Sequence, residues 1–154
     1  MKESIKSILV FILQWEARKI LEKYKPKIIA ITGSVGKTST KDAIFSVFAE
    51  SHYVRKSEKS FNSQIGLPLT ILGCQNGWNN PMIWLKNIFK GLMHIIIRTN
   101  YPDWLILEVG ADSPGGIRKT AEWLKPDIIV MTRFGKVPVH IEFFNSVEDL
   151  IQED

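Results

Sequence analysis

Hydrophobic positions along the chain alternate between short continuous runs and longer stretches in which polar residues recur every three or four positions. The first pattern predicts buried strands and the second predicts helices. The predicted strands lie near 27–32, 52–55, 104–109 and 127–132. Helices are expected near 38–50, 81–98, 114–124 and 146–153. Strands that alternate with helices in this way predict an α/β fold, with a mostly parallel sheet flanked by helices.

The segment 81–98 is the most apolar of the expected helices. Its large hydrophobic residues outnumber the polar ones, among which are Lys86, Lys90 and His94. A helix that is apolar over most of its surface is expected to lie in a protein interior. We therefore predict a largely buried helix here, with an ordinary loop before it at 75–80.

The N-terminal segment 1–25 contains an apolar run at 8–13 that superficially resembles a signal peptide. The run is short, no small-residue cleavage site follows it, and the apolar pattern continues through charged positions. An amphipathic helix is therefore predicted, ending near Lys25-Pro26 because proline disfavours helix in the residue before it. Its mixed charges favour docking on the rest of the chain, whereas docking on another domain or on a membrane surface stays open. Membrane association is not expected.

Composition limits the number of domains, the partners and the location. The 154 residues suffice for a single globular domain with a core. The net charge of +4 is modest and no dense block of Lys or Arg marks a nucleic-acid surface, so nucleic acid is not an expected partner. Cys74 is the only cysteine, so neither a disulfide framework nor a zinc site can be built from cysteine. A reducing, cytoplasmic location fits best.

A candidate phosphate-binding loop (P-loop) follows the first predicted strand, in the sequence ITGSVGKTST. Gly33 and Gly36 allow a tight turn whose N–H groups can approach phosphate oxygens. Lys37 supplies a cation, and the Thr38 hydroxyl can ligate Mg²⁺. A nucleoside triphosphate such as ATP is the expected ligand. The candidate nucleotide-binding residues are Gly33, Ser34, Val35, Gly36, Lys37, Thr38 and Ser39.

One position of this loop departs from the strict motif. Ile31 stands where the motif has its first glycine. The order of strand, turn and helix offsets that loss. A glycine-rich turn that binds nothing is the alternative, which the flanking strand and the Lys-Thr-Ser-Thr string disfavour.

A second candidate is the carboxylate of Glu108, which ends the apolar run WLIL. In parallel sheets the ligand crevice lies outside the carboxyl ends of the strands, so this carboxylate is expected to face the P-loop. There it could hold Mg²⁺ directly or through water. A solvated glutamate at a strand end is the alternative.

His140 is the third candidate, because it follows the strand at 127–132 and the loop after it. A neutral imidazole can ligate a second metal ion beside one that a carboxylate holds, and two metal ions suit chemistry at a γ-phosphate. A surface histidine or a hydrogen-bonded one is the commoner alternative. His52 and His94 have no comparable position and are interpreted as structural.

The sequence contains, in order, the four blocks ITGSVGKTSTKDA, FNSQIGLPLTILG, LEVGADSPGGI and KPDIIVMTRFGKVPVHIEFF. Over residues 27–154 these blocks resemble the central, ATP-binding domain of the Mur ligases. The likeness is greatest to the members that add D-alanyl-D-alanine to UDP-N-acetylmuramoyl-tripeptide in making the peptidoglycan precursor. The resemblance implies an ATP- and Mg²⁺-dependent ligase: a carboxylate attacks the γ-phosphate, an acyl phosphate forms, and an amine displaces phosphate. The implied partners are the nucleotide, the UDP-sugar peptide and D-alanyl-D-alanine.

The resemblance also implies roles for single residues. Lys37 would contact the β- and γ-phosphates, and Thr38 would ligate the first Mg²⁺. Glu108 and His140 would ligate a second metal ion and, with Lys37, would be the catalytic residues. Asn62 would line the substrate side of the cleft.

Two further positions concern the loop and the end of the chain. Gly66 and Pro68 would fix the path of the loop after Asn62, with a plain turn into a helix as the alternative. The lysine that bridges metal in the family has no counterpart at 152–154. Either Asp154 takes its place or the chain stops before an equivalent residue.

The expected organisation is an N-terminal helix at 1–25 followed by a central ATP-binding domain at 26–154. Because family members also carry an N-terminal substrate domain and a C-terminal domain that brings the amine, this chain is expected to be part of a larger ligase. By itself it should bind nucleotide weakly and ligate little, since catalysis needs both reactants fixed in a closed site. Two other classes stay open, namely another P-loop NTPase or kinase and a non-catalytic nucleotide-binding module.

Overall fold

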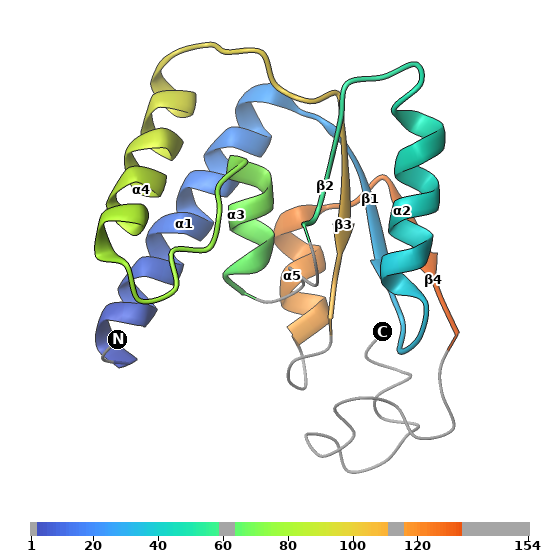
Figure 1. Ribbon diagram of the computed structural model, residues 1–154, viewed down its shortest axis with the longest axis horizontal. Helices are drawn as coiled ribbons and strands as arrows, with labels where there is room; N and C mark the ends of the chain where they lie inside the picture. Colours follow the sequence, from blue (N-terminus) through green and yellow to red (C-terminus); the bar gives the residue numbers. More distant parts are fainter. Residues whose placement is uncertain (1–2, 59–63, 111–115, 134–154) are drawn as a thin grey trace.

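The computed structural model describes residues 3–58, 64–110 and 116–133. In this part of the chain four parallel strands form one sheet in the order β2-β3-β1-β4, and helices cover both of its faces (Figure 1). The predicted α/β fold is confirmed. The elements are α1 (Glu3–Tyr24), β1 (Lys27–Thr32), α2 (Lys37–Phe48), β2 (Val54–Lys56), α3 (Gly66–Leu72), α4 (Pro81–Ile96), β3 (Trp104–Glu108), α5 (Gly116–Leu124) and β4 (Ile128–Met131).

Most predicted elements agree with the structure to within two residues, but α3 was not predicted. The prediction that Gly66 and Pro68 fix a loop is wrong, because both residues lie in the first turn of α3, as the alternative of a turn into a helix allowed. Proline fits there because the first turn needs no N–H from it. All seven residues of α3 are buried, so the segment shows no polar periodicity that would mark a helix. The predicted helix at 146–153 lies outside the described residues.

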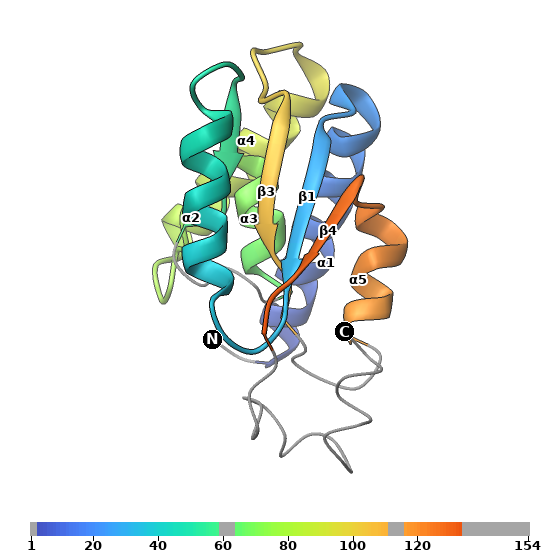
Figure 2. The same cartoon turned by 90° about the vertical axis from the view of Figure 1, so that its right-hand side faces the viewer.

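The two faces of the sheet bury different helices. On β1, Ile28 and Ala30 join the core that contains α1, α3 and α5, whereas Ile29 and Ile31 pack with α2. This alternation follows from the pleat of a strand, which sends successive side chains to opposite faces. Figure 2 shows α2 on one side of the sheet and α1 and α5 on the other.

Helix α1 docks on the domain, as predicted. It ends at Tyr24, where Lys25 adopts a left-handed φ of 50° directly before Pro26. The Lys23 ammonium donates hydrogen bonds to the carbonyls of His94 and Ile95, at 2.8 Å each, so the end of α1 also caps the end of α4. The residues that α1 buries in the core are Leu9, Leu13, Ala17 and Ile20.

The prediction that α4 is largely buried is wrong. This helix begins at Pro81, with the Asn80 carboxamide oxygen accepting from the N–H of Met82 at 3.0 Å. It packs against α1 and α3 in an outer layer, so among the described residues it has neighbours on one side and buries one stripe of its surface. The buried residues are Trp84, Asn87 and Gly91. Across the described ranges, no helix combines the length and the apolarity that crossing a membrane requires.

The two histidines interpreted as structural both contact other side chains of the fold, although His52 is exposed and His94 is half-buried. The ring of His52 lies 6.0 Å from that of Phe48 and 6.1 Å from that of Trp104, between centroids. His94 Nδ1 lies 2.7 Å from the Thr99 hydroxyl oxygen, and burial lowers the pKa of this imidazole.

One carboxyl group is buried without hydrogen bonds between α1 and α4. Glu16 is 0% exposed, and in the described part of the chain neither of its carboxyl oxygens has a hydrogen-bond partner. It fills the space above Gly91, where an added Cβ would stand 2.2 Å from Glu16 Oε2. Desolvation raises the pKa of Glu16 from 4.5 to about 7.

Glu16 should therefore make the fold less stable as the pH rises. The folded chain keeps this proton to a higher pH than the unfolded chain does, so raising the pH from 4.5 to about 7 lowers the free energy of unfolding, by about 3 kcal/mol in total. We expect Glu16→Gln to stabilise the protein by about 2 kcal/mol near pH 8 and to change little near pH 5, because an amide has no charge to desolvate. Urea denaturation at both pH values measures this, with Glu22→Gln, on the exposed side of α1, as the control. A Glu16→Gln effect that is equal at the two pH values would contradict the prediction.

Candidate functional site

The predicted P-loop connects the end of β1 to the start of α2. Gly33 and Gly36 have φ values of 113° and 91°, in the left-handed region that favours glycine. The loop is also held to the end of β4. The Val35 N–H donates to the Arg133 carbonyl at 3.0 Å, and the Thr132 N–H donates to the Thr32 carbonyl at 2.9 Å. The turn is therefore fixed by its glycines and by the neighbouring strand.

Helix α2 begins directly at this turn, with Gly36 as its N-cap. Gly36 offers no side-chain cap, and the first turn of the helix contains no acidic residue. The N–H groups of a helix's first turn have no partner within the helix, and together with the helix dipole they favour an anion. Lys37 adds a positive charge at the same point, and its ammonium donates to the Gly33 carbonyl across the loop. The start of α2 can therefore receive a phosphate group.

Glu108 lies beside this helix start, as the sequence predicted. It is the last residue of β3 and pairs in register with Ile31 of β1, one residue before the end of that strand. Its side chain is 1% exposed, and Oε2 accepts a hydrogen bond from the Thr38 hydroxyl at 3.4 Å. The alternative of a solvated carboxylate is therefore wrong. The parallel register explains the contact, because adjacent strands that run in the same direction end at the same edge.

Two residues of this cluster were not identified from the sequence. Lys41 Nζ lies 3.0 Å from Glu108 Oε1, and the Lys41 side chain is 2% exposed. The Ser57 hydroxyl accepts from the Glu108 N–H at 3.2 Å. Lys41 stands one helical turn after Lys37, so the spacing of four residues was the signal that both lysines face the same edge of the sheet.

The chemistry of this cluster suits a hard divalent cation. The Thr38 hydroxyl oxygen and Glu108 Oε2 are adjacent oxygen donors beside an expected phosphate site, which is the donor set that Mg²⁺ prefers. In the described part of the chain Glu108 Oε1 accepts no hydrogen bond, and its neighbour is the Lys41 ammonium. The residues present therefore fit Mg²⁺ at Oε2, while Lys41 balances the charge at Oε1.

The remaining candidates fall into two groups. Val35 is 58% exposed, Ser39 is exposed and Ser34 is half-buried, so these loop residues are open to a ligand. His140 and Asn62 lie outside the described residues, and their roles stay predictions.

The geometry of the loop predicts that its two glycines differ in importance. A Cβ at Gly33 would stand 2.4 Å from the Thr132 hydroxyl oxygen and 2.8 Å from the Thr132 carbonyl oxygen, whereas a Cβ at Gly36 would meet nothing within 4 Å. Both substitutions carry the strain of a positive φ, about 1–2 kcal/mol. We therefore expect Gly36→Ala to lower the free energy of unfolding by about that amount and Gly33→Ala to lower it by clearly more. Urea denaturation of the two variants measures this, and equal losses would contradict it.

Known proteins match the chain in sequence, although no protein-family model matches it. The UDP-N-acetylmuramoyl-tripeptide–D-alanyl-D-alanine ligase of Borreliella burgdorferi is 28% identical over 147 residues, which are 96% of this chain and 26% of that protein. The ligase of the same name from Rickettsia prowazekii is 30% identical over 131 residues, 85% of this chain and 23% of that protein. For the Bacillus subtilis ligase the identity is 34% over 95 residues, 62% of this chain and 21% of that protein. The chain thus spans about a quarter of the length of these relatives.

Solved structures agree with the sequence matches. The MurF ligase of Thermotoga maritima, crystallised in complex with ADP, superposes with a TM-score of 0.68 at 26% identity, covering 94% of this chain and 28% of that one. MurF of Acinetobacter baumannii has the same fold, with a TM-score of 0.66 at 20% identity over 92% of this chain and 26% of that one. Sequence and fold therefore confirm the resemblance, and the chain is a homologue of the D-alanyl-D-alanine-adding Mur ligases over the part of their length that it spans.

Proposed function

We propose that this chain supplies the ATP-binding part of a ligase that joins a carboxylate to an amine. The observation that carries the proposal is the contact between the Thr38 hydroxyl and the buried Glu108 carboxylate at the uncapped start of α2. This contact provides oxygen donors for a metal ion next to N–H groups and an ammonium for phosphate. The ADP in the crystals of the Thermotoga maritima relative supports a nucleotide as the ligand.

In the proposed site each group of this chain has one task. The N–H groups at the start of α2 and the Lys37 ammonium bind the phosphate oxygens and orient the γ-phosphate for attack by a carboxylate. The Thr38 hydroxyl and Glu108 would hold Mg²⁺, which when bound neutralises charge on the phosphates. The Lys41 ammonium, 3.0 Å from Glu108 Oε1, would balance the charge of that carboxylate. His140 and Asn62 belong to the proposal through the family resemblance, as a metal ligand and a substrate contact.

The substrates follow from the names of the relatives. These names describe the addition of D-alanyl-D-alanine to UDP-N-acetylmuramoyl-tripeptide, and the chain corresponds to about a quarter of such a protein. We therefore propose that a larger protein containing this segment carries out that step of peptidoglycan precursor synthesis. The cytoplasmic location expected from the single cysteine belongs to the same proposal. Cys74 is a buried free thiol, which agrees with a reducing compartment.

The test combines binding with product analysis. Isothermal titration with a non-hydrolysable ATP analogue and Mg²⁺ should give binding by the chain, because the phosphate and metal groups all lie within it. In the larger protein, ADP and phosphate should appear only when UDP-N-acetylmuramoyl-tripeptide and D-alanyl-D-alanine are both supplied. Phosphate release without either substrate would indicate another NTPase, and binding without any turnover would indicate a non-catalytic module. Either result overturns the ligase proposal.

A further inference from the structure

The outward sides of α1 and α4 carry large apolar side chains that nothing in the described part of the chain covers. Phe11 is 71% exposed, Phe89 is 64% exposed and Ile96 is 75% exposed. Single exposed hydrophobic residues are ordinary on a protein surface, whereas a contiguous group of them marks an interaction site. We call this group the α1–α4 face. Its main members are Ile8, Phe11, Trp15, Leu85, Phe89 and Ile96.

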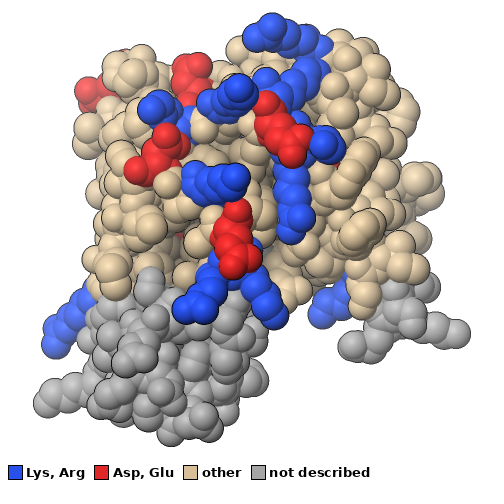
Figure 3. All heavy atoms as spheres, turned by 180° about the vertical axis from the view of Figure 1, so that it is seen from behind, with Lys and Arg blue, Asp and Glu red and all other residues tan. Residues whose placement is uncertain are grey.

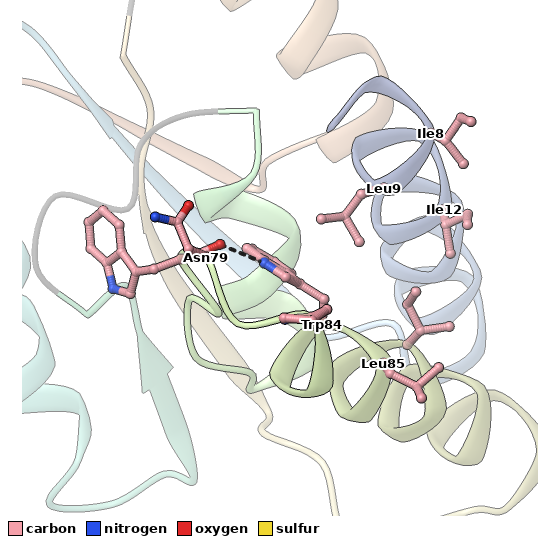
Figure 4. Close-up of a pocket in the computed structure, with 9 residues that line it drawn as sticks. Ile8, Leu9, Ile12, Asn79, Trp84 and Leu85 are labelled. Carbon is pink, nitrogen blue, oxygen red and sulfur yellow. Dashed lines mark hydrogen bonds between the residues drawn. The ribbon is translucent and has the colours of Figure 1, made fainter. Parts of the chain in front are cut away.

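An apolar groove of about 600 Å³ joins the two helices into one surface. Ile8 and Ile12 of α1 and Leu85 of α4 line this groove, and Figure 4 shows them on the two helices. The indole N–H of Trp84 donates to the Trp78 carbonyl at 2.9 Å, so this group needs no hydrogen bond from a ligand in the groove. The groove is therefore apolar, and it is continuous with the exposed residues on both of its edges.

The charged residues within 4–15 and 81–98 are all basic. Neither residues 4–15 nor residues 81–98 contain an Asp or a Glu, while Lys6 and Lys86 are exposed within them. Lys90 is also exposed, but its ammonium donates a hydrogen bond to the Gly73 carbonyl. Charged side chains of both signs are mixed over the middle of the surface in Figure 3, but its right-hand edge, where α4 lies after the turn from Figure 1, shows no acidic side chain. An apolar face with exposed lysines on both of its helices suits an anionic partner.

We propose that the α1–α4 face docks on an anionic phospholipid surface. The apolar side chains would enter the boundary between headgroups and acyl chains, and the lysine stems would lie along it with their ammonium groups at the lipid phosphates. Helices α1 and α4 would lie along the membrane surface and would not cross the membrane. This proposal revises the expectation against membrane association, because two of the three acidic residues of α1, Glu16 and Glu22, come after Trp15, and Glu3 at the start of the helix is the third.

Another occupant fits the face less well. A second copy packed through the same face would set the lysines of one chain against those of the other, at a cost in like-charge repulsion. Lysines beside exposed aromatic rings are typical of helices that bind membrane surfaces. Docking on lipid would also leave the nucleotide site open, because α2 lies on the opposite side of the sheet from α1 (Figure 2).

Vesicle sedimentation tests the proposal on the whole chain. We expect it to sediment with vesicles of phosphatidylglycerol and phosphatidylcholine, and far less with phosphatidylcholine alone. Phe11→Ser combined with Phe89→Ser should weaken the binding by about tenfold or more, since both rings lose their burial in lipid. Lys86→Glu should weaken binding to the anionic vesicles by about fivefold or more and leave the neutral ones unchanged. All three positions are exposed, so these variants should fold.

Val47→Ser is the matched control, because Val47 is also a large exposed hydrophobic residue but lies on α2. It should bind vesicles as the original chain does, and urea denaturation should show every variant folded. Equal vesicle binding by the original chain and the double serine variant would overturn the proposal, and so would a complete lack of binding to anionic vesicles. A dimer in solution that the double serine variant dissociates, with vesicle binding unchanged, would assign the face to a second copy instead. Nucleotide titration of the same variants separates this proposal from the ligase proposal, because their affinity for ATP should not change.

Discussion

Lys41→Met is expected to lower the free energy of unfolding by about 3–5 kcal/mol, because it leaves a buried carboxylate without its counter-ion. Lys41 and Glu108 are 2% and 1% exposed, and their charged atoms lie 3.0 Å apart. Methionine keeps much of the length and apolar character of the lysine stem. The loss of stability should therefore come mainly from removal of the positive charge. Urea denaturation near neutral pH measures it.

The control for this prediction is an ion pair of the same kind at the surface. Lys19 lies 2.8 Å from Glu22 on α1, but the two side chains are 45% and 66% exposed. Lys19→Met should cost less than about 1 kcal/mol, because water screens the pair. Adding Glu108→Gln to the Lys41→Met variant should restore most of the lost stability, since the buried charge is then absent. A loss that persists in the double variant would show that Lys41 stabilises the fold through contacts other than the ion pair.

Lys37→Ala is expected to weaken ATP binding roughly a hundredfold, as the loss of two charge-assisted hydrogen bonds of about 1.5 kcal/mol each implies. The Lys37 ammonium already lies across the P-loop, where it contacts the Gly33 carbonyl. Its position near the start of α2 puts its charge beside the N–H groups that would bind phosphate. Isothermal titration with a non-hydrolysable ATP analogue and Mg²⁺ measures the change.

Lys27→Ala is the matched control for charge. Lys27 begins β1 at the opposite end of the strand from the P-loop and pairs with Asp127 at 3.5 Å. Its removal should leave ATP affinity within about twofold, because a solvent-exposed charge at that distance is screened. If Lys37→Ala and Lys27→Ala weaken binding equally, the lysine acts through net charge and the proposed phosphate site is wrong.

The candidate site was predictable from the sequence wherever the chain itself dictates the geometry. Gly33 and Gly36 indicate a turn with positive φ, and the strand before them and the helix after them follow from hydrophobic pattern. Glu108 was predictable because parallel strands end at a common edge. Lys41 was missed because a lysine on a helix is ordinarily solvated, and only the contact with a buried carboxylate identifies its role.

The exposure of helix α4 and the burial of Glu16 were not predictable from the sequence. The apolar composition of 81–98 predicts a helix but not its depth, because hydrophobicity does not indicate how many layers lie outside it. Helix α4 packs on α1 and α3 rather than in the centre, which leaves the α1–α4 face exposed. Glu16 is one of the charged residues in the N-terminal helix, yet the docking of that helix on α4 places it against Gly91.

The sequence by itself determined the alternating strands and helices, the P-loop and the carboxylate at the end of β3, because each depends on local backbone chemistry or on a rule of parallel sheets. Only the tertiary structure decided which charges are buried and which apolar residues stay exposed. Burial depends on the neighbours that packing brings from distant parts of the chain, such as Lys41 against Glu108 and Glu16 against Gly91. Those neighbours set the free-energy cost of burying each charge, and no local sequence pattern identifies them.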